Sequence, residues 1–393
     1  MDLHSDRGIE QILLNLKSSP LFQFSLASKE LFHSNFLYWL HINYPEPCGS
    51  LFAEILPKHP VSYYPLRVYR EQNNFDLFVA YPQGEVIIFE NKVKSLPLES
   101  QLEAISAKIK NKEQTGFVLL SLTRPTFLRK GDTHIRLTDG TIWNYFSYQE
   151  LAEKLSLICD NVANSSTYHG LLLRDYIDYI INLDRLQRFF SIDWDDTSAN
   201  FFIDQDYFSQ ISEIRIHDLI GKMRYAQLAE QIKEHLQHEG FTLMLNGLWK
   251  ANKCEVFVDF GMTNGEPLID MKYSVVNYTE TKYPIVVGVQ LQGKCFRLLV
   301  EVGNATIAEK IATELWNGIN NRRLWFDFEK LTILSSVEYP KKGLFNQYSQ
   351  IFYYRYRKID KATPMQLSEI IISYAKEARN SQAQLEEMIK KVL

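Results

Sequence analysis

Three ionisable residues between positions 69 and 94 have the types and the spacing of a metal-dependent active site. Asp76 lies in one apolar run, and Glu90, Asn91 and Lys92 end the next one, after a Pro-Gln-Gly turn. Side chains alternate along a strand, so Glu90 and Lys92 share a face while Asn91 points away. A hairpin formed by the two runs would bring Asp76 beside Glu90.

This arrangement predicts a site for a hard divalent cation. Two carboxylates and a backbone carbonyl are oxygen ligands of the kind that Mg²⁺ or Mn²⁺ prefers, with waters completing the shell. We therefore expect Asp76, Glu90 and the Asn91 carbonyl to bind the metal, which suits hydrolysis of a phosphodiester. Lys92 is expected to act on the attacking water or on the developing charge.

The elements that must position these residues can be predicted from the hydrophobic periodicity. The period changes from helical to strand-like and back, which is typical of an α/β unit. We expect helices at 29–42, 98–112, 149–158 and 166–190, and strands within 66–80, 86–92, 117–122 and 135–148.

These residues resemble the PD-(D/E)XK nuclease superfamily, in a branch that consists largely of uncharacterised bacterial proteins. The resemblance rests on Glu30 in KELFHSNFLYWL, on Glu71 and Asp76 in REQNNFD, on IIFENK, and on Gln101-Leu102. It covers about residues 20–190, with Phe75 where many members have Pro.

The resemblance implies an α/β restriction-endonuclease-like core with a mixed central sheet, and a Mg²⁺- or Mn²⁺-dependent nuclease that acts on DNA. It further implies that Glu30 supports a second ion or a water, and that Gln101 touches the site or the substrate backbone. A setting in bacterial defence or DNA processing is inferred from the family alone.

Several of these residues have a second interpretation. Glu30 could instead pair with Arg67 or Arg70. Glu71 lies five residues before Asp76 and would face the other side of a regular strand, so it would need a bulge to join the site. The whole cluster could also be a salt-bridge network in an inactive module that keeps the fold and binds nucleic acid or a protein partner.

A second acidic-x-Lys triplet occurs in the C-terminal half. Asp270 and Lys272 follow Asp259 across a turn. Without a preceding helix and a following helix-strand unit, we expect an exposed cross-strand ion pair on a half-buried hairpin.

Two segments are candidates for nucleic-acid contact. Residues 86–130 contain eight Lys or Arg and four Glu, a local charge of +4 in which Lys94 shares the strand face of Lys92. In the run 352–360, Tyr353, Arg355 and Arg357 share one strand face, and Phe352, Tyr354 and Tyr356 the other. We predict that Arg355 and Arg357 contact nucleic acid.

Length and composition set the remaining limits. A length of 393 residues favours two domains. The net charge of −4 excludes a chain that is basic throughout. We expect a nuclease-like domain at 1–190, an acidic linker at 191–205, and an α+β domain at 206–393. The second domain would recognise substrate, form a homodimer or bind a partner protein.

Four cysteines without a CxxC pair argue against a zinc ribbon. The N-terminus lacks an apolar signal segment. The sequence has no run of about 18 apolar residues, the length needed to cross a membrane, so a cytoplasmic location is expected.

Overall fold

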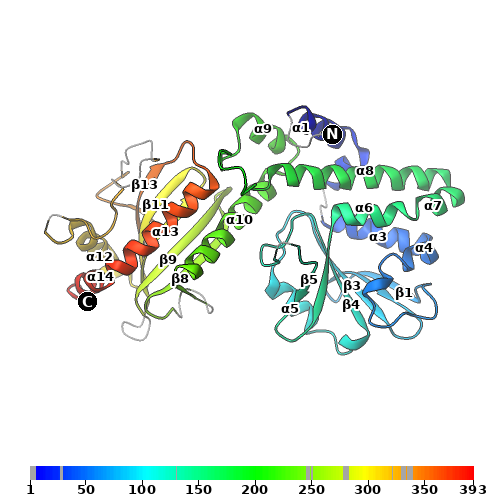
Figure 1. The fold of residues 1–393 in the computed structure, drawn as a ribbon, viewed down its shortest axis with the longest axis horizontal. Coiled ribbons are helices and arrows are strands. Elements are labelled where there is room, and N and C mark those ends of the chain that lie inside the picture. The colour runs from blue at the N-terminus through cyan, green and yellow to red at the C-terminus, as the bar shows by residue number, and fades with distance from the viewer. Residues whose placement is uncertain are drawn as a thin grey trace. The chain divides into compact units, whose positions relative to one another are not determined.

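The computed structural model describes residues 6–26, 30–129, 131–244, 248, 251–277, 283–320, 322–328, 333 and 340–393. The chain forms two compact units, shown in Figure 1. The first unit comprises Met1–Ser191 and Ser209–Ile220, and the second comprises Ile192–Phe208 and Gly221–Leu393.

The first unit contains a mixed six-stranded sheet in the order β1-β2-β3-β4-β6-β5. The pairs β1–β2, β2–β3 and β5–β6 are antiparallel, whereas β3–β4 and β4–β6 are parallel. The strands are β1 (Arg67–Gln72), β2 (Phe75–Ala80), β3 (Val86–Lys92), β4 (Thr115–Ser121), β5 (His134–Arg136) and β6 (Ile142–Ser147).

Helices flank this sheet, which confirms the predicted α/β class. They are α1 (Asp6–Ser18), α2 (Pro20–Ser25), α3 (Glu30–Asn43), α4 (Pro45–Gly49), α5 (Glu99–Ser106), α6 (Tyr148–Ser156), α7 (Cys159–Ser165) and α8 (Thr167–Phe190), with 3₁₀ turns η1 (Ala53–Ile55) and η2 (Lys112–Gln114). Helix α8 packs against α1, α6 and α7 (Figure 1).

The centre of the first sheet is buried on both faces. Ile88 of β3 and Leu119 of β4 are fully buried. A strand covered on both sides cannot alternate polar and apolar residues, which explains the continuous apolar runs in these strands. Leu102 and Ile105 of α5 pack on the face that carries Ile88, and α3 contacts β1, β2 and β3.

Helix α5 is shorter than predicted. It ends at Ser106, and the chain reaches β4 through the 3₁₀ turn η2. Between Ser106 and Phe117 the only large apolar residue is Ile109, so further helical turns would bury little apolar surface.

The second unit contains a seven-stranded sheet in the order β12-β13-β11-β10-β9-β8-β7, antiparallel except for β7–β8. Its strands are β7 (Thr242–Leu243), β8 (Glu255–Thr263), β9 (Glu266–Val276), β10 (Ile285–Gln292), β11 (Cys295–Val302), β12 (Asn346–Ser349) and β13 (Phe352–Lys358). The helices that pack with it are α10 (His217–His238), α12 (Ala305–Asn317), α13 (Pro364–Asn380) and α14 (Gln382–Lys390), whereas α9 (Gln205–Glu213) belongs from Ser209 on to the first unit.

This sheet and its helices agree with the predicted α+β class. The apolar spacing over 206–238 predicts one long helix, but the structure has two, because Arg215 adopts a left-handed φ of 56° between them. The sequence also predicts a strand near 331–337, which lies outside the described residues apart from Ile333.

The predicted linker at 191–205 differs from the structure. Ile192, Phe201 and Phe202 belong to the apolar core of the second unit, and Phe201 is only 1 % exposed. The acidic and polar residues around these rings suggested an exposed connection, but two adjacent aromatic side chains are enough to fix the segment on a core.

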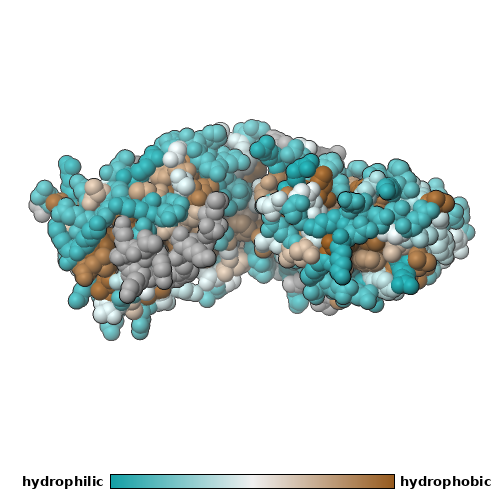
Figure 2. Space-filling view, turned by 90° about the horizontal axis from the view of Figure 1, so that it is seen from below, coloured by the Kyte–Doolittle hydropathy of each residue, from teal (hydrophilic) through white to brown (hydrophobic). Residues whose placement is uncertain are grey.

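The described residues include no helix with the length and apolar character needed to span a bilayer. Figure 2 shows that hydrophilic residues cover most of the visible face, with smaller hydrophobic patches between them.

Candidate active site

The antiparallel register of β1, β2 and β3 brings three carboxylates close together. Leu77 pairs with Phe89, so the next positions along the two strands place Asp76 opposite Glu90. The pairs Arg70–Leu77 and Gln72–Phe75 bracket Glu71, which therefore lies opposite Asp76. Directly opposed residues have Cβ atoms about 4.5–5.5 Å apart and point to the same side.

A tight turn creates the alignment of Glu71 with Asp76. Asn73 and Asn74 have φ values of 58° and 63°, the backbone that a two-residue hairpin turn requires and that Asn tolerates. Glu71 itself has a left-handed φ of 52°, so β1 departs from regular strand geometry at this residue, in line with the irregularity that the sequence argument required for Glu71 to approach the site. The Asn-Asn pair is the local sequence signal for the turn.

Glu90 and Lys92 form a buried ion pair at the end of β3. Lys92 Nζ lies 2.8 Å from Glu90 Oε1, and the two side chains are 10 % and 4 % exposed. Gln101 of α5 donates a hydrogen bond of 2.7 Å to the same carboxylate oxygen. The predicted proximity of Gln101 to the site is therefore present, and its contact in the structure is Glu90.

Burial and mutual repulsion perturb the proton affinities of this cluster. Burial, followed by the charge of Glu90, raises the pKa of Asp76 to about 7. Burial also raises the pKa of Glu90, against the opposing effect of Lys92. For Lys92, burial would lower the pKa, but the carboxylates of Glu90, Glu30 and Asp76 outweigh it and raise the pKa. Buried, like-charged carboxylates beside a cation are typical of functional sites.

The same residues fall within a match to a known family. A family model described as PD-(D/E)XK nuclease superfamily matches residues 21–178. This part of the chain belongs to that superfamily. Searches among curated proteins and among solved structures gave no match. The family match lies within the first unit, which is called the PD-(D/E)XK unit from here on, and does not extend into the second unit.

Asn91 contacts the cluster of Asp76, Glu90 and Lys92 through its backbone and the buried interior through its side chain. Its backbone N–H donates to Asp76 Oδ2 at 2.6 Å. Its side chain points to the other face, where it donates to the Glu30 carbonyl at 3.1 Å and accepts from the Tyr148 hydroxyl at 2.5 Å. Tyr148 is fully buried and lies 57 residues away in sequence, so no local pattern indicated its role.

Glu30 binds the loop that follows β3. Its Oε1 accepts from the N–H groups of Val93, Lys94 and Ser95 at 3.3, 3.3 and 3.0 Å, and from the Ser95 hydroxyl at 2.5 Å. The pairing with Arg67 or Arg70 considered from the sequence is replaced by these backbone contacts. Glu30 is therefore placed to position the end of β3, and its charge still acts on Glu90 and Lys92.

Glu30→Ala is expected to lower the free energy of unfolding by about 1–3 kcal/mol, because several N–H donors lose a charged acceptor. Thermal or urea unfolding would measure the effect. Glu46→Ala is the matched control, since Glu46 is exposed on α4 of the same unit. Equal stability of the two variants would contradict the positioning role of Glu30.

The predicted basic rim at 86–130 is partly used within the protein. Lys94 Nζ donates to the Arg215 carbonyl at 2.9 Å, Lys112 pairs with Asp139, and Arg124 donates to two backbone carbonyls. Lys130 lies outside the described residues. The contact of Lys94 with nucleic acid stays a prediction, and it would compete with the bond to Arg215.

Arg355 and Arg357 lie in the second unit on the face of β13 that packs against its core. The Arg355 guanidinium lies 3.8 Å from the centroid of the Trp316 ring, and that of Arg357 lies 5.6 Å from the Phe328 ring. The strand alternation was predicted correctly, but these stacking contacts favour a packing role over the predicted nucleic-acid contact.

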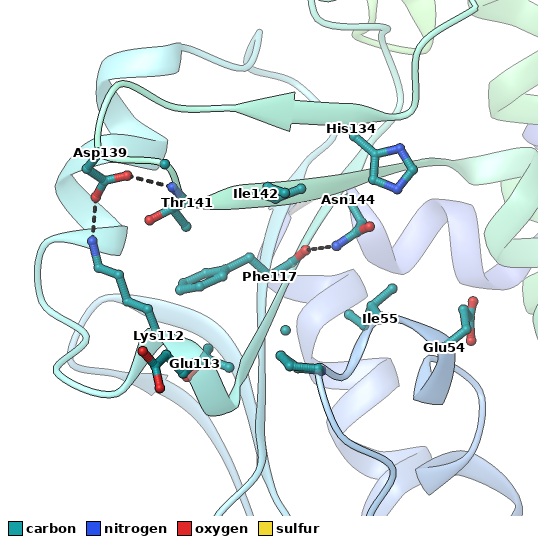
Figure 3. Close-up of a pocket in the computed structure, with 14 residues that line it drawn as sticks. Glu54, Ile55, Lys112, Glu113, Phe117, His134, Asp139, Thr141, Ile142 and Asn144 are labelled. Atoms are coloured by element: carbon teal, nitrogen blue, oxygen red, sulfur yellow. Dashed lines mark hydrogen bonds and ion pairs between the residues drawn. The ribbon is translucent and has the colours of Figure 1, made fainter.

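The PD-(D/E)XK unit also contains a 510 Å³ cavity at the other end of its parallel strands (Figure 3). Thr115 and Gly116 at the start of β4 line it, and Thr115 pairs with Val86, whereas Lys92 pairs with Ser121. Figure 3 shows the Lys112–Asp139 ion pair at its rim. The cavity is therefore separate from the carboxylate cluster.

Proposed function

We propose that the PD-(D/E)XK unit hydrolyses phosphodiester bonds of DNA in a reaction that depends on Mg²⁺ or Mn²⁺. The proposal rests on the opposed carboxylates of Asp76 and Glu90 beside the buried ammonium of Lys92. Holding two like charges together in a buried place costs free energy, and a divalent cation removes that cost.

The oxygen atoms available in the cluster fit such a cation. Asp76 uses Oδ2 for the Asn91 N–H, and Glu90 uses Oε1 for Lys92 and Gln101. Among the described residues, Asp76 Oδ1 and Glu90 Oε2 have no such contact and would be the ligands, with the Asn91 carbonyl as a further donor. When bound, the ion supplies a Lewis acid and counter-charge for the phosphodiester.

The side chains around the metal position have distinct proposed roles. Lys92 provides a fixed positive charge and a proton donor beside the reacting phosphate. Gln101 holds the Glu90 carboxylate in one orientation through its hydrogen bond. Glu71, opposite Asp76, adds a third carboxylate that acts on both Asp76 and Glu90.

A second candidate function is a binding module that keeps the fold without cleaving. Across the described residues, no group of three or more His, Cys, Asp and Glu is placed to hold a metal ion. The Glu90–Lys92–Gln101 contacts also satisfy one another without a metal. The defence or DNA-processing setting and a homodimer stay predictions.

The test is a cleavage assay on single-stranded DNA, duplex DNA and RNA, with Mg²⁺, Mn²⁺ or EDTA, for the wild type and Asp76→Asn. We expect metal-dependent cleavage of DNA by the wild type and a loss of about 10²-fold or more in the variant, because one of two protein carboxylates is removed. Equal cleavage by both proteins would refute the proposal, and binding without cleavage would favour the second function.

A further inference from the structure

The sheet of the second unit has two chemically different faces. One face contributes Met271, Val289 and Leu298 to the apolar core that also contains residues of α10, α12, α13 and α14. In the register of the sheet, Asp270 pairs with Gln290, and Gln290 pairs with Arg297. These polar residues therefore share the opposite face, which we call the polar face.

Lys272, Asp270 and Glu301 on the polar face are paired within the sheet. Lys272 Nζ lies 2.8 Å from Glu301 and 3.6 Å from Asp270, and Gln290 donates to Asp270 at 2.8 Å. Lys272 is only 8 % exposed, so the exposed ion pair predicted from the sequence is wrong. Lys272 thus partly neutralises Asp270 and Glu301, whereas Asp259, opposite Asp270 on β8, is exposed and makes that end of the face less favourable for an anion than the β13 end.

A ladder of three aromatic rings follows β13 on the polar face. The ring centroids of Phe352 and Tyr354 are 6.0 Å apart, and those of Tyr354 and Tyr356 are 6.5 Å apart. Neither pair is parallel, with interplanar angles of 63° and 45°, so the rings do not cover one another face to face. The Arg297 guanidinium lies 4.7 Å from the centroid of the Tyr354 ring and covers one face of that ring with a planar cation.

Lysines lie beside this ladder. A 440 Å³ pocket at the β12 edge is lined by Tyr354 of the polar face, by the core residues Tyr353 and Phe345, and by Lys341 and Lys342, with Glu309 as the acidic residue. Both lysines are exposed, and Lys358 is exposed at the end of β13. Half-buried rings bordered by exposed cations can bind a chain that alternates flat bases with phosphates.

We propose that the polar face of the second unit binds single-stranded nucleic acid. Tyr354 and Tyr356 would stack on bases, and Lys341 and Lys342 would contact phosphates. A duplex hides its base faces in its own stack, so a ring ladder favours a single strand. This inference goes beyond the proposed nuclease activity and does not depend on cleavage.

The test measures binding by the full-length protein in EDTA, with fluorescently labelled 20-nucleotide single strands of DNA and of RNA and a 20-base-pair duplex. Tyr354→Leu/Tyr356→Leu keeps apolar volume but removes the rings. We expect single-strand affinity to fall about 10-fold or more, since stacking is worth about 1–3 kcal/mol per base. Affinity for the duplex should be weaker in the wild type and nearly unchanged in the variant.

Two controls separate stacking from general damage. Tyr354→Phe/Tyr356→Phe should bind like the wild type, and so should Tyr168→Leu, which removes an exposed ring of α8. If the leucine variant does not fold, Lys341→Gln/Lys342→Gln provides the decision. It should reduce the slope of log affinity against log salt by about 1.4, at about 0.7 per phosphate contact.

Equal single-strand affinity of the wild type and the folded leucine variant would overturn the proposal, as would an unchanged salt slope in the lysine variant. A wild type that binds the duplex more tightly than the single strands would also overturn it. Because no cleavage occurs in EDTA, these outcomes are independent of whether Asp76→Asn affects hydrolysis.

Discussion

Lys92→Gln is expected to reduce DNA cleavage about 10²–10³-fold while leaving metal binding intact at pH 8. Gln can still donate a hydrogen bond to Glu90, so the 2.8 Å contact of the native ammonium has a neutral replacement. What is lost is a positive charge beside the reacting phosphate, and fixed donors of this kind are worth about 10²–10³ in rate.

The charge of Lys92 also competes with the proposed metal. Its ammonium stabilises the ionised Glu90 carboxylate and partly neutralises it. Removing that charge at a pH where the carboxylates are ionised leaves a more negative site, so Mn²⁺ affinity should be equal or higher in Lys92→Gln. A structural lysine would give a different pattern, namely loss of stability together with loss of cleavage.

Single-turnover cleavage and calorimetric Mn²⁺ titration would measure the two quantities separately. Lys58→Gln is the control, since Lys58 is exposed and lies outside the cluster. Cleavage by Lys92→Gln within about threefold of the wild type would remove Lys92 from the proposed mechanism. Loss of Mn²⁺ binding would instead make the lysine a structural support of the carboxylates.

The part of the site that was predictable from sequence is the part encoded locally. Glu90 and Lys92 are two positions apart on a strand, with only Asn91 between them, so their shared face follows from the alternation of side chains alone. Asp76 required one further assumption, a hairpin between β2 and β3, and extending the register by one position beyond Leu77 and Phe89 places it opposite Glu90.

The contacts that could not be predicted depend on register or on distant segments. The left-handed φ of Glu71 next to the Asn73-Asn74 turn, which lets this residue approach Asp76, could not be read from the alternation of side chains alone. Tyr148, which holds Asn91 from behind, comes from α6 and has no signal near the motif. The backbone contacts of Glu30 with residues 93–95 likewise arise only when α3 packs against the sheet.

The second unit shows the same limit. Alternation along β13 predicts that Tyr354 and Arg355 face opposite sides, but not which side packs. That choice is made by Trp316 of α12, whose ring lies against the Arg355 guanidinium. The two arginines of this strand are therefore used for packing, and Tyr354 and Tyr356 on the opposite face are the residues for which we propose nucleic-acid binding.

Asp76→Asn is expected to stabilise the metal-free protein at pH 8 relative to the wild type. The pKa of Asp76 is about 7 in the folded protein because burial and the charge of Glu90 disfavour its ionised form, against an ordinary value of 3.8. The folded state thus holds a proton that the unfolded chain has already released. Stability must therefore fall as the pH rises from about 4 to about 7.

The size of the effect follows from the same pKa. At about 1.36 kcal/mol per pH unit, the change from 3.8 to about 7 corresponds to at most about 4 kcal/mol. Asparagine cannot ionise, so the variant escapes this loss. Urea unfolding in EDTA should give nearly equal stabilities near pH 4 and a difference of a few kcal/mol in favour of the variant at pH 8.

A divalent cation should reverse this order, and the reversal separates a metal ligand from a merely strained carboxylate. Mn²⁺ at about 100 times its dissociation constant adds about 2.7 kcal/mol to the wild type and little to Asp76→Asn. Binding requires the ionised carboxylate, so below about pH 7 the wild type's affinity should fall about tenfold per pH unit. A wild type that gains no stability from Mn²⁺ at pH 8 would show that the repulsion between Asp76 and Glu90 is not relieved by a metal. The cluster would then be the buried network of a binding module.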